Sequence, residues 1–109
     1  MPPKIKITKE EIIRAGLDIV RREGESALNA RSIAAVLGCS TQPVFSNYAS
    51  MEELRRAVMV AAAERYSQYI VREVSAGTYP AYKASGIAYI RFAKEEKNLF
   101  KLLYMRDRG

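Results

Sequence analysis

The sequence predicts an all-α protein, and three observations support this fold class. No run of the 109-residue chain alternates apolar and polar residues as a half-buried strand would. Residues 51–75 contain neither proline nor glycine, which favours one long helix. Residues 30–48 place two short apolar-faced segments on either side of a glycine, and this pattern is typical of a helix-turn-helix.

Composition limits the size and class of the protein. With 49% hydrophobic and 28% charged residues, the chain fits one compact globular domain. No apolar stretch approaches the roughly 18 residues that span a bilayer, and the N-terminus lacks the apolar part of a signal peptide. We therefore expect a soluble, cytoplasmic protein that does not act at a membrane. The single cysteine, Cys39, rules out an internal disulfide; it either packs in a tight turn or serves as a redox sensor.

The basic charge is spread along the chain. The formal net charge is +6, of which residues 1–50 carry +2 (seven basic minus five acidic) and residues 51–109 carry +4 (eleven minus seven). Residues 26–50 contain no carboxylate, and Arg31 is their only charged side chain. A surface that lies against phosphates benefits from excluding negative charge. A short buried motif also has few charges, so both explanations stay open.

The first helix is expected after a short basic arm. Residues 1–7 form this arm, whose lysines either reach DNA or remain a solvated tail. Thr8 and Glu11 form a capping box that starts the helix, and Gly24 ends it. The apolar stripe of this helix follows a 3.6-residue period and consists of Ile12, Ala15, Gly16, Ile19 and Val20.

Two short helices follow. Asn29 is expected to cap a helix over residues 30–37, and Gly38 to close it in the left-handed conformation. Ser40 is expected to cap the next helix, over residues 41–48. Pro43 then falls at the third helical position, where its missing amide costs no intrahelical bond.

The inward face of that helix and the role of its last aromatic residue are open at this point. Val44 points inward together with either Phe45 or Tyr48. Tyr48 either packs in the core or places its hydroxyl on a phosphate.

The second half of the chain is expected to hold three further helices. Ser50 and Glu53 form another capping box at the start of the long helix, and residues 76–80 break it. Another helix runs from Pro80 to about residue 96. Asn98 then caps a last helix over residues 99–105, which is apolar nearly all round. The adjacent carboxylates at 52–53 and 95–96 are interpreted as caps and helix-surface charges.

The run TKEEIIRAGLDIVRREGESALNARSIAAVLGCSTQPVFSNYASMEEL resembles the N-terminal head of the TetR family of bacterial transcriptional regulators. The segment AYIRFAKEEKNLFKLLY, residues 88–104, is similar to the opening of the effector domain in one branch of that family. The positions that match the head are Ile33, Ala34, Gly38, Ser40, Phe45, Tyr48, Ser50, Glu53 and Leu54.

The resemblance implies a domain organisation and a function. It divides the chain into a flexible basic arm (1–7), a helix-turn-helix DNA-binding head (8–50), a connecting helix (51–76) and the start of an effector-binding or dimerisation domain (77–109). Because the family's effector domain continues further, we expect the chain to be truncated. The implied function is that of a sequence-specific regulator of transcription, a repressor that binds double-stranded DNA as a homodimer and is released by an unknown small-molecule effector.

Two sets of candidate site residues follow. Pro43 and Met51 stand where the family commonly has threonine and lysine, so phosphate contacts would fall to the backbone at the start of the long helix and to other basic residues. The candidate DNA-binding residues are Arg31, Ser40, Thr41, Gln42, Pro43, Ser46, Asn47, Tyr48 and Met51. The candidate effector or dimer surface consists of Tyr66, Tyr69, Ile70, Tyr89, Phe92, Phe100 and Leu103.

Other functional classes find less support in the sequence. The chain has no histidine, no Gly-rich phosphate loop and no metal-spaced cluster, so we expect no catalysis, no metal and no cofactor. A basic membrane-surface helix is disfavoured because the charges are interspersed. The alternative that stays open is a helical protein-interaction module that uses the apolar face of residues 99–105.

Overall fold

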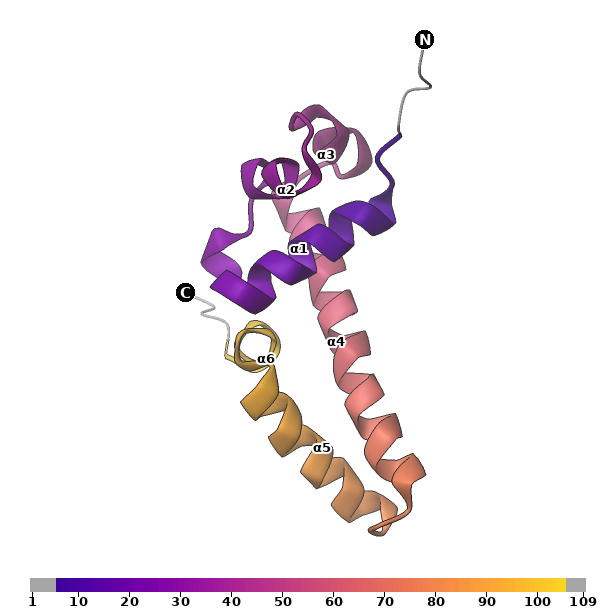
Figure 1. Ribbon diagram of the computed structural model, residues 1–109. Helices are drawn as coiled ribbons and strands as arrows, with labels where there is room; N and C mark the ends of the chain where they lie inside the picture. Colours follow the sequence, from indigo (N-terminus) through magenta and orange to yellow (C-terminus); the bar gives the residue numbers. More distant parts are fainter. Residues whose placement is uncertain (1–5, 106–109) are drawn as a thin grey trace.

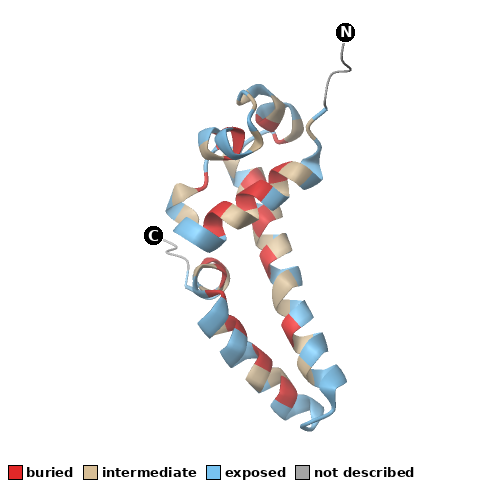
Figure 2. Ribbon diagram, in the orientation of Figure 1, coloured by how far each residue is buried: buried red, intermediate tan, exposed pale blue. Residues whose placement is uncertain are grey.

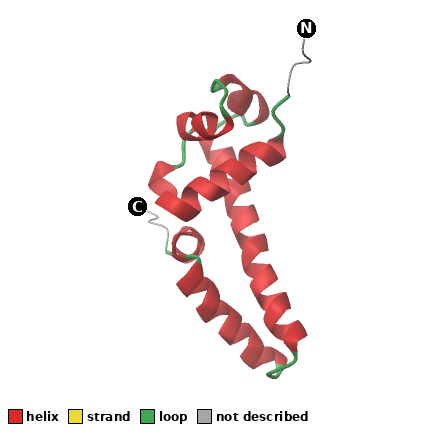
Figure 3. Cartoon of the chain, viewed as in Figure 1, coloured by secondary structure: helices red, strands yellow, loops and turns green. Residues whose placement is uncertain are grey.

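The computed structural model describes residues 6–105, and every regular element within this range is helical (Figure 3). The predicted all-α class is therefore confirmed. Residues 1–5 of the expected arm lie outside the described residues. The elements are α1 (Lys9–Glu23), the 3₁₀ turn η1 (Glu25–Ala27), α2 (Ala30–Leu37), α3 (Gln42–Asn47), α4 (Met51–Ala76), α5 (Ala81–Glu95) and α6 (Lys97–Tyr104).

Helix α1 lies between the α2–α3 pair and the N-terminal half of α4 (Figure 1). Its predicted apolar stripe is buried as expected, with Ile12 and Val20 fully enclosed. Gly16 allows α1 and α4 to approach closely, since a methyl group there would lie 3.0 Å from Val58 Cγ2. The Thr8 hydroxyl accepts the Glu11 amide at 3.1 Å, so the hydroxyl half of the first capping box is present.

The second half of the chain forms an antiparallel helical hairpin. Helix α4 ends at Gly77, which has φ +69°, and α5 returns along α4 towards α1 (Figure 1). The radius of gyration is 16.3 Å, whereas a compact domain of this length has about 13 Å. The hairpin therefore projects from the α1–α3 end of the molecule.

Helix α6 differs from its prediction in two ways. It begins at Lys97, so Asn98 lies inside the helix, and its side chain donates a 2.9 Å hydrogen bond to the Arg21 carbonyl oxygen. It is also two-faced: Leu99 and Leu102 are buried against the neighbouring helices, whereas the opposite side is open to solvent (Figure 2). The segment expected to be apolar nearly all round is thus buried on one side only, and the apolar Tyr104 and Met105 are exposed.

None of the helices in residues 6–105 combines the length and the apolar character that crossing a membrane requires.

Candidate nucleic-acid interface

A tight turn connects α2 to α3. Asn29 caps α2 as predicted, through a reciprocal pair of hydrogen bonds with Ser32. Gly38 ends α2 in the left-handed conformation, with φ +68°, and the Cys39 amide donates to the Ala34 carbonyl at 3.0 Å. The paired backbone groups of this turn fix the position of α3 relative to α2.

Helix α3 begins one residue later than the sequence predicts. Thr41, not Ser40, occupies the N-cap position, and its side chain makes no capping bond. Pro43 consequently lies at the second helical position, where its missing amide has no partner within the helix. The proline is compatible with α3, as expected, but the predicted Ser40 cap was wrong.

The inward side of α3 consists of Val44, which is 1% exposed, and of Tyr48 just beyond its end, which is 7% exposed. Phe45 is 54% exposed, so of the two aromatic residues considered for the core only Tyr48 belongs to it. Burial raises the pKa of the Tyr48 phenol. The Lys9 ammonium lies 5.3 Å from the centroid of the Tyr48 ring, and this cation–π contact joins the start of α1 to the end of α3.

The outward side of α3 carries Gln42, Phe45 and Ser46, which are all exposed. Their spacing of three and four residues places them on one helix face. The Asn47 side-chain amide is already engaged within the helix, because it donates a 2.7 Å hydrogen bond to the Pro43 carbonyl oxygen. Gln42 is therefore the amide side chain that α3 presents freely to a ligand.

A groove separates α3 from the segment that precedes α1. Lys6 and Ile7 form one side of it, and the other side is formed by Ser40, Gln42, Pro43, Ser46 and Asn47. Ile7 packs against the hydrophobic core and so fixes the chain at this point. The exposed Lys6, one of the arm lysines for which the sequence left DNA contact open, is thereby placed beside the outward residues of α3.

Capping bonds occupy two amides at and before the N-terminus of α4. The Ser50 hydroxyl accepts the Glu53 amide at 3.1 Å, as predicted. The Glu53 carboxylate accepts the Ala49 amide at 3.0 Å, and so reaches one residue further back than in the expected box. Met51 is partly buried against the core. With two glutamates in the first turn, this helix end is a weaker site for a phosphate than its dipole alone would indicate.

Arg31 is exposed on α2. It is the only cation on the carboxylate-free segment 26–50. Lys6 lines the groove beside α3, and Lys9 lies over the Tyr48 ring. Two cationic side chains, Lys6 and Lys9, therefore lie beside α3 or the residue that follows it, and α3 itself is uncharged.

Five of the seven candidate effector or dimer residues form one aromatic cluster between α4, α5 and α6. Tyr66 lies at its centre, with its ring centroid 5.0 Å from that of Phe92 and 6.3 Å from that of Tyr89. The cluster also includes Tyr69, Phe100 and Tyr104. Ile70 and Leu103 are partly buried beside the core and contribute no ring.

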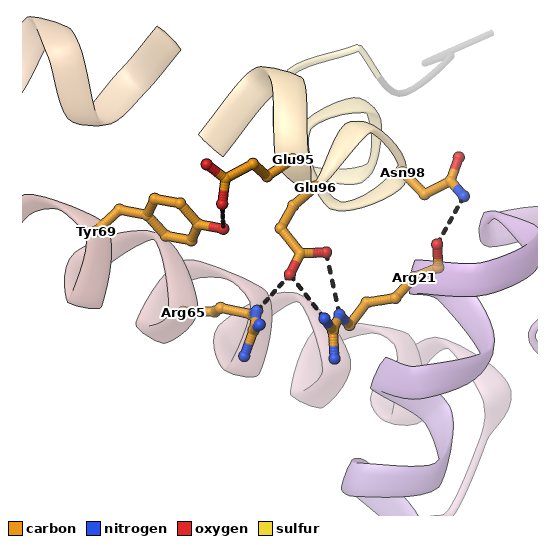
Figure 4. A network of polar contacts seen from close by, with 6 residues as sticks. All are labelled: Arg21, Arg65, Tyr69, Glu95, Glu96 and Asn98. Atoms are coloured by element: carbon orange, nitrogen blue, oxygen red, sulfur yellow. Dashed lines mark hydrogen bonds and ion pairs between the residues drawn. The ribbon is translucent and has the colours of Figure 1, made fainter. Parts of the chain in front are cut away.

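A buried carboxylate lies next to this cluster. Glu96 is 6% exposed and accepts hydrogen bonds from Arg21 Nε at 3.0 Å and from Arg65 Nε at 2.6 Å (Figure 4). Burial alone would raise the pKa of the Glu96 carboxyl, but the bonds from the two arginines outweigh it and hold this pKa below its usual value. The same contact raises the pKa of Arg21. The expectation that Glu96 is a helix-surface charge was wrong.

Sequence reasoning missed two features of these regions. Tyr104 is the sixth ring of the cluster, and the partners of Glu96, Arg21 and Arg65, lie 75 and 31 positions away in sequence. The helical spacing of three residues between Tyr66 and Tyr69, and again between Tyr89 and Phe92, was a sequence signal for the cluster.

No protein-family model matches the chain, and comparisons with curated proteins and with solved structures found no match. The function is therefore inferred from the residues of the chain itself.

Proposed function

We propose that this protein is a sequence-specific, DNA-binding regulator of transcription, in which α2 and α3 form a helix-turn-helix and α3 enters the major groove. One observation carries this proposal: α3 presents an uncharged outward face beside the exposed Lys6, in a segment that is free of carboxylates from residue 26 to residue 50. Phosphates repel carboxylates and attract cations at the edges of such a face.

Base reading falls mainly to Gln42. Its amide can accept from adenine N6 and donate to adenine N7, and its side chain is exposed on the outward face. Ser46 is exposed next to it and can meet a base or a phosphate. Asn47 is a weaker candidate because its amide already bonds to the Pro43 carbonyl oxygen.

Backbone contacts fall to basic residues more than to the start of α4. Lys6 lies beside α3 and Arg31 is exposed on α2, whereas the Glu53 carboxylate accepts the Ala49 amide just before α4 and brings a negative charge there. Tyr48 acts from the core by supporting α3, since it is 7% exposed.

The regulatory part of the proposal uses the second half of the chain. In a homodimer the two copies of α3 would lie about 34–36 Å apart, one turn of DNA, so the operator would be near-palindromic. A small-molecule effector would bind at the aromatic cluster, where Tyr89 and Tyr104 are 41% and 51% exposed. The Glu96 contact with Arg21 then links that site to α1.

Selection from a random DNA library followed by fluorescence-anisotropy titration tests the proposal. We expect one sequence to be enriched and bound more tightly than a scrambled duplex. Gln42→Ala should weaken binding to it by about 1–3 kcal/mol and relax the preference at one base pair. Arg31→Ala should weaken binding to all sequences and lower the salt dependence.

Matched controls are available on the distal helices. Gln68→Ala and Lys101→Ala remove an exposed amide from α4 and an exposed ammonium from α6, and both should leave DNA binding unchanged. If selection enriches no sequence, or if the Gln42 and Arg31 variants bind like their controls, the proposal is wrong.

The alternative function is a protein-interaction module on residues 99–105, and this segment exposes little apolar surface. Leu99 and Leu102 are buried within the molecule, so the apolar side chains that remain open are mainly those of Tyr104 and Met105. An isolated pair of this kind is common on protein surfaces. The DNA titration separates the two functions, since the alternative predicts no sequence preference.

A further inference from the structure

Phe45 is the unexpected feature of the outward face of α3. A phenylalanine in a six-residue helix would ordinarily be buried, yet 54% of Phe45 is exposed, and the core position is taken by Tyr48. Within residues 6–105 no other aromatic ring contacts it. Its neighbours on this face are Gln42 and Ser46, which are polar.

The floor of the major groove presents one apolar group, the C5-methyl of thymine. We propose that Phe45 contacts this methyl group in each half-site and so specifies thymine at one position. The inference rests on the proposed DNA binding, and it adds a second determinant of sequence beside Gln42.

The position of the thymine relative to the base read by Gln42 follows from helix geometry. Three residues separate Gln42 from Phe45, which corresponds to about 4.5 Å along the helix axis. Successive base pairs are about 3.4 Å apart. The thymine and the adenine contacted by Gln42 therefore belong to neighbouring base pairs, and each half-site contains two adjacent A·T pairs.

Replacing thymine with uracil removes only the methyl group and leaves every hydrogen-bonding group in place. Burial of one methyl-sized group changes an equilibrium about fourfold. We therefore expect uracil at the contacted position to weaken binding of the wild-type protein about fourfold for each half-site. Uracil at the other thymines of the operator should have little effect.

The experiment is a uracil scan of the duplex enriched from the random library, read by fluorescence anisotropy with the full chain. It is repeated with Phe45→Ala, which should bind the thymine and uracil duplexes equally. Phe45→Leu keeps an apolar but smaller side chain and should retain part of the difference. Val36→Ala, which shortens a 48% exposed apolar residue on α2, is the matched control and should behave like the wild type.

The outcomes separate this inference from the function on which it rests. An enriched operator in which no uracil weakens wild-type binding overturns the role of Phe45 and leaves the regulator proposal intact. The same holds if the loss persists undiminished in Phe45→Ala. If no sequence is enriched, the proposed function fails, and the role of Phe45 fails with it. Equal melting temperatures of the variants confirm that these exposed substitutions leave the fold unchanged.

Discussion

The Nε and Nη2 atoms of Arg21 each lie 3.0 Å from an oxygen of the Glu96 carboxylate, in a bidentate contact across 75 positions of sequence (Figure 4). Arg65 Nε reaches the same carboxylate at 2.6 Å. One acidic side chain at the junction of α5 and α6 therefore holds both α1 and α4. A bidentate arginine fixes orientation as well as distance, so the angle of α1 against the hairpin depends on Glu96.

Glu96→Gln should destabilise the fold. The change leaves two guanidinium groups beside a neutral amide, but both arginines are about one-third exposed, so water screens part of the loss. We expect a decrease of about 1–2 kcal/mol in the free energy of unfolding, measured by urea denaturation. Asp18→Asn is the matched control, because it removes a solvent-exposed ion pair with Arg22 and should cost less than about 0.5 kcal/mol. Equal losses in the two variants would contradict the central role of Glu96.

The same carboxylate makes stability depend on pH in the acid range. Because the pKa of Glu96 in the folded protein lies below its ordinary value of 4.5, the unfolded chain binds its proton first. The stabilisation is fully present above pH 4.5 and is lost as the pH falls through the folded-state pKa. Urea titrations from pH 3 to 7 should show the wild type and Glu96→Gln converging below pH 4.5. A gap that stays constant over this range would exclude titration of Glu96 as its source.

Lys6→Ala tests the basic side of the groove next to α3. A lysine that neutralises one phosphate contributes about 0.9 to the slope of log affinity against log salt concentration. The variant should lose about that much slope per protomer while it keeps the sequence preference, because Lys6 reads no base. Lys101→Ala, on α6, should keep the wild-type slope. A Lys6 variant with an unchanged slope would remove this residue from the DNA contact.

Two glycines within helices should respond to alanine with opposite signs. At Gly16 an added methyl group meets Val58 Cγ2 at 3.0 Å and Leu28 Cδ1 at 3.3 Å, so Gly16→Ala should destabilise the protein by about 1 kcal/mol. At Gly86 nothing lies within 4 Å, so the gain in helix propensity should stabilise it by about 0.5–1 kcal/mol. Thermal denaturation of both variants compares them directly. A stabilised Gly16 variant would show that α1 and α4 can separate without cost.

Much of the fold could be predicted because its helix ends are encoded locally. Thr8, Asn29 and Ser50 each sit within four residues of the groups that they cap, and Gly38 carries its own conformational preference. Such signals depend on neighbours in sequence, so a single chain discloses them. The long α4 was recognised for the same reason, since nothing within it interrupts a helix.

The failures concern side chains whose surroundings come from distant segments. In a helix as short as α3, six residues do not define which side faces inward, so Phe45 and Tyr48 were indistinguishable by period. Glu96 looked like a surface charge because its two arginines come from other helices. Asn98 likewise bonds to the Arg21 carbonyl oxygen, a group 77 positions away, instead of capping α6.

The projecting α4–α5 hairpin makes local stability uneven along the chain. Near its free end Val71 and Tyr82 are 62% and 82% exposed, whereas Ala62 and Phe92 are fully buried towards its base. Backbone amides at the free end should therefore exchange their hydrogens through local openings of low free energy. Amides at the base should exchange only through larger openings of higher free energy. We therefore expect hydrogen exchange to show the two helices opening from the turn inwards.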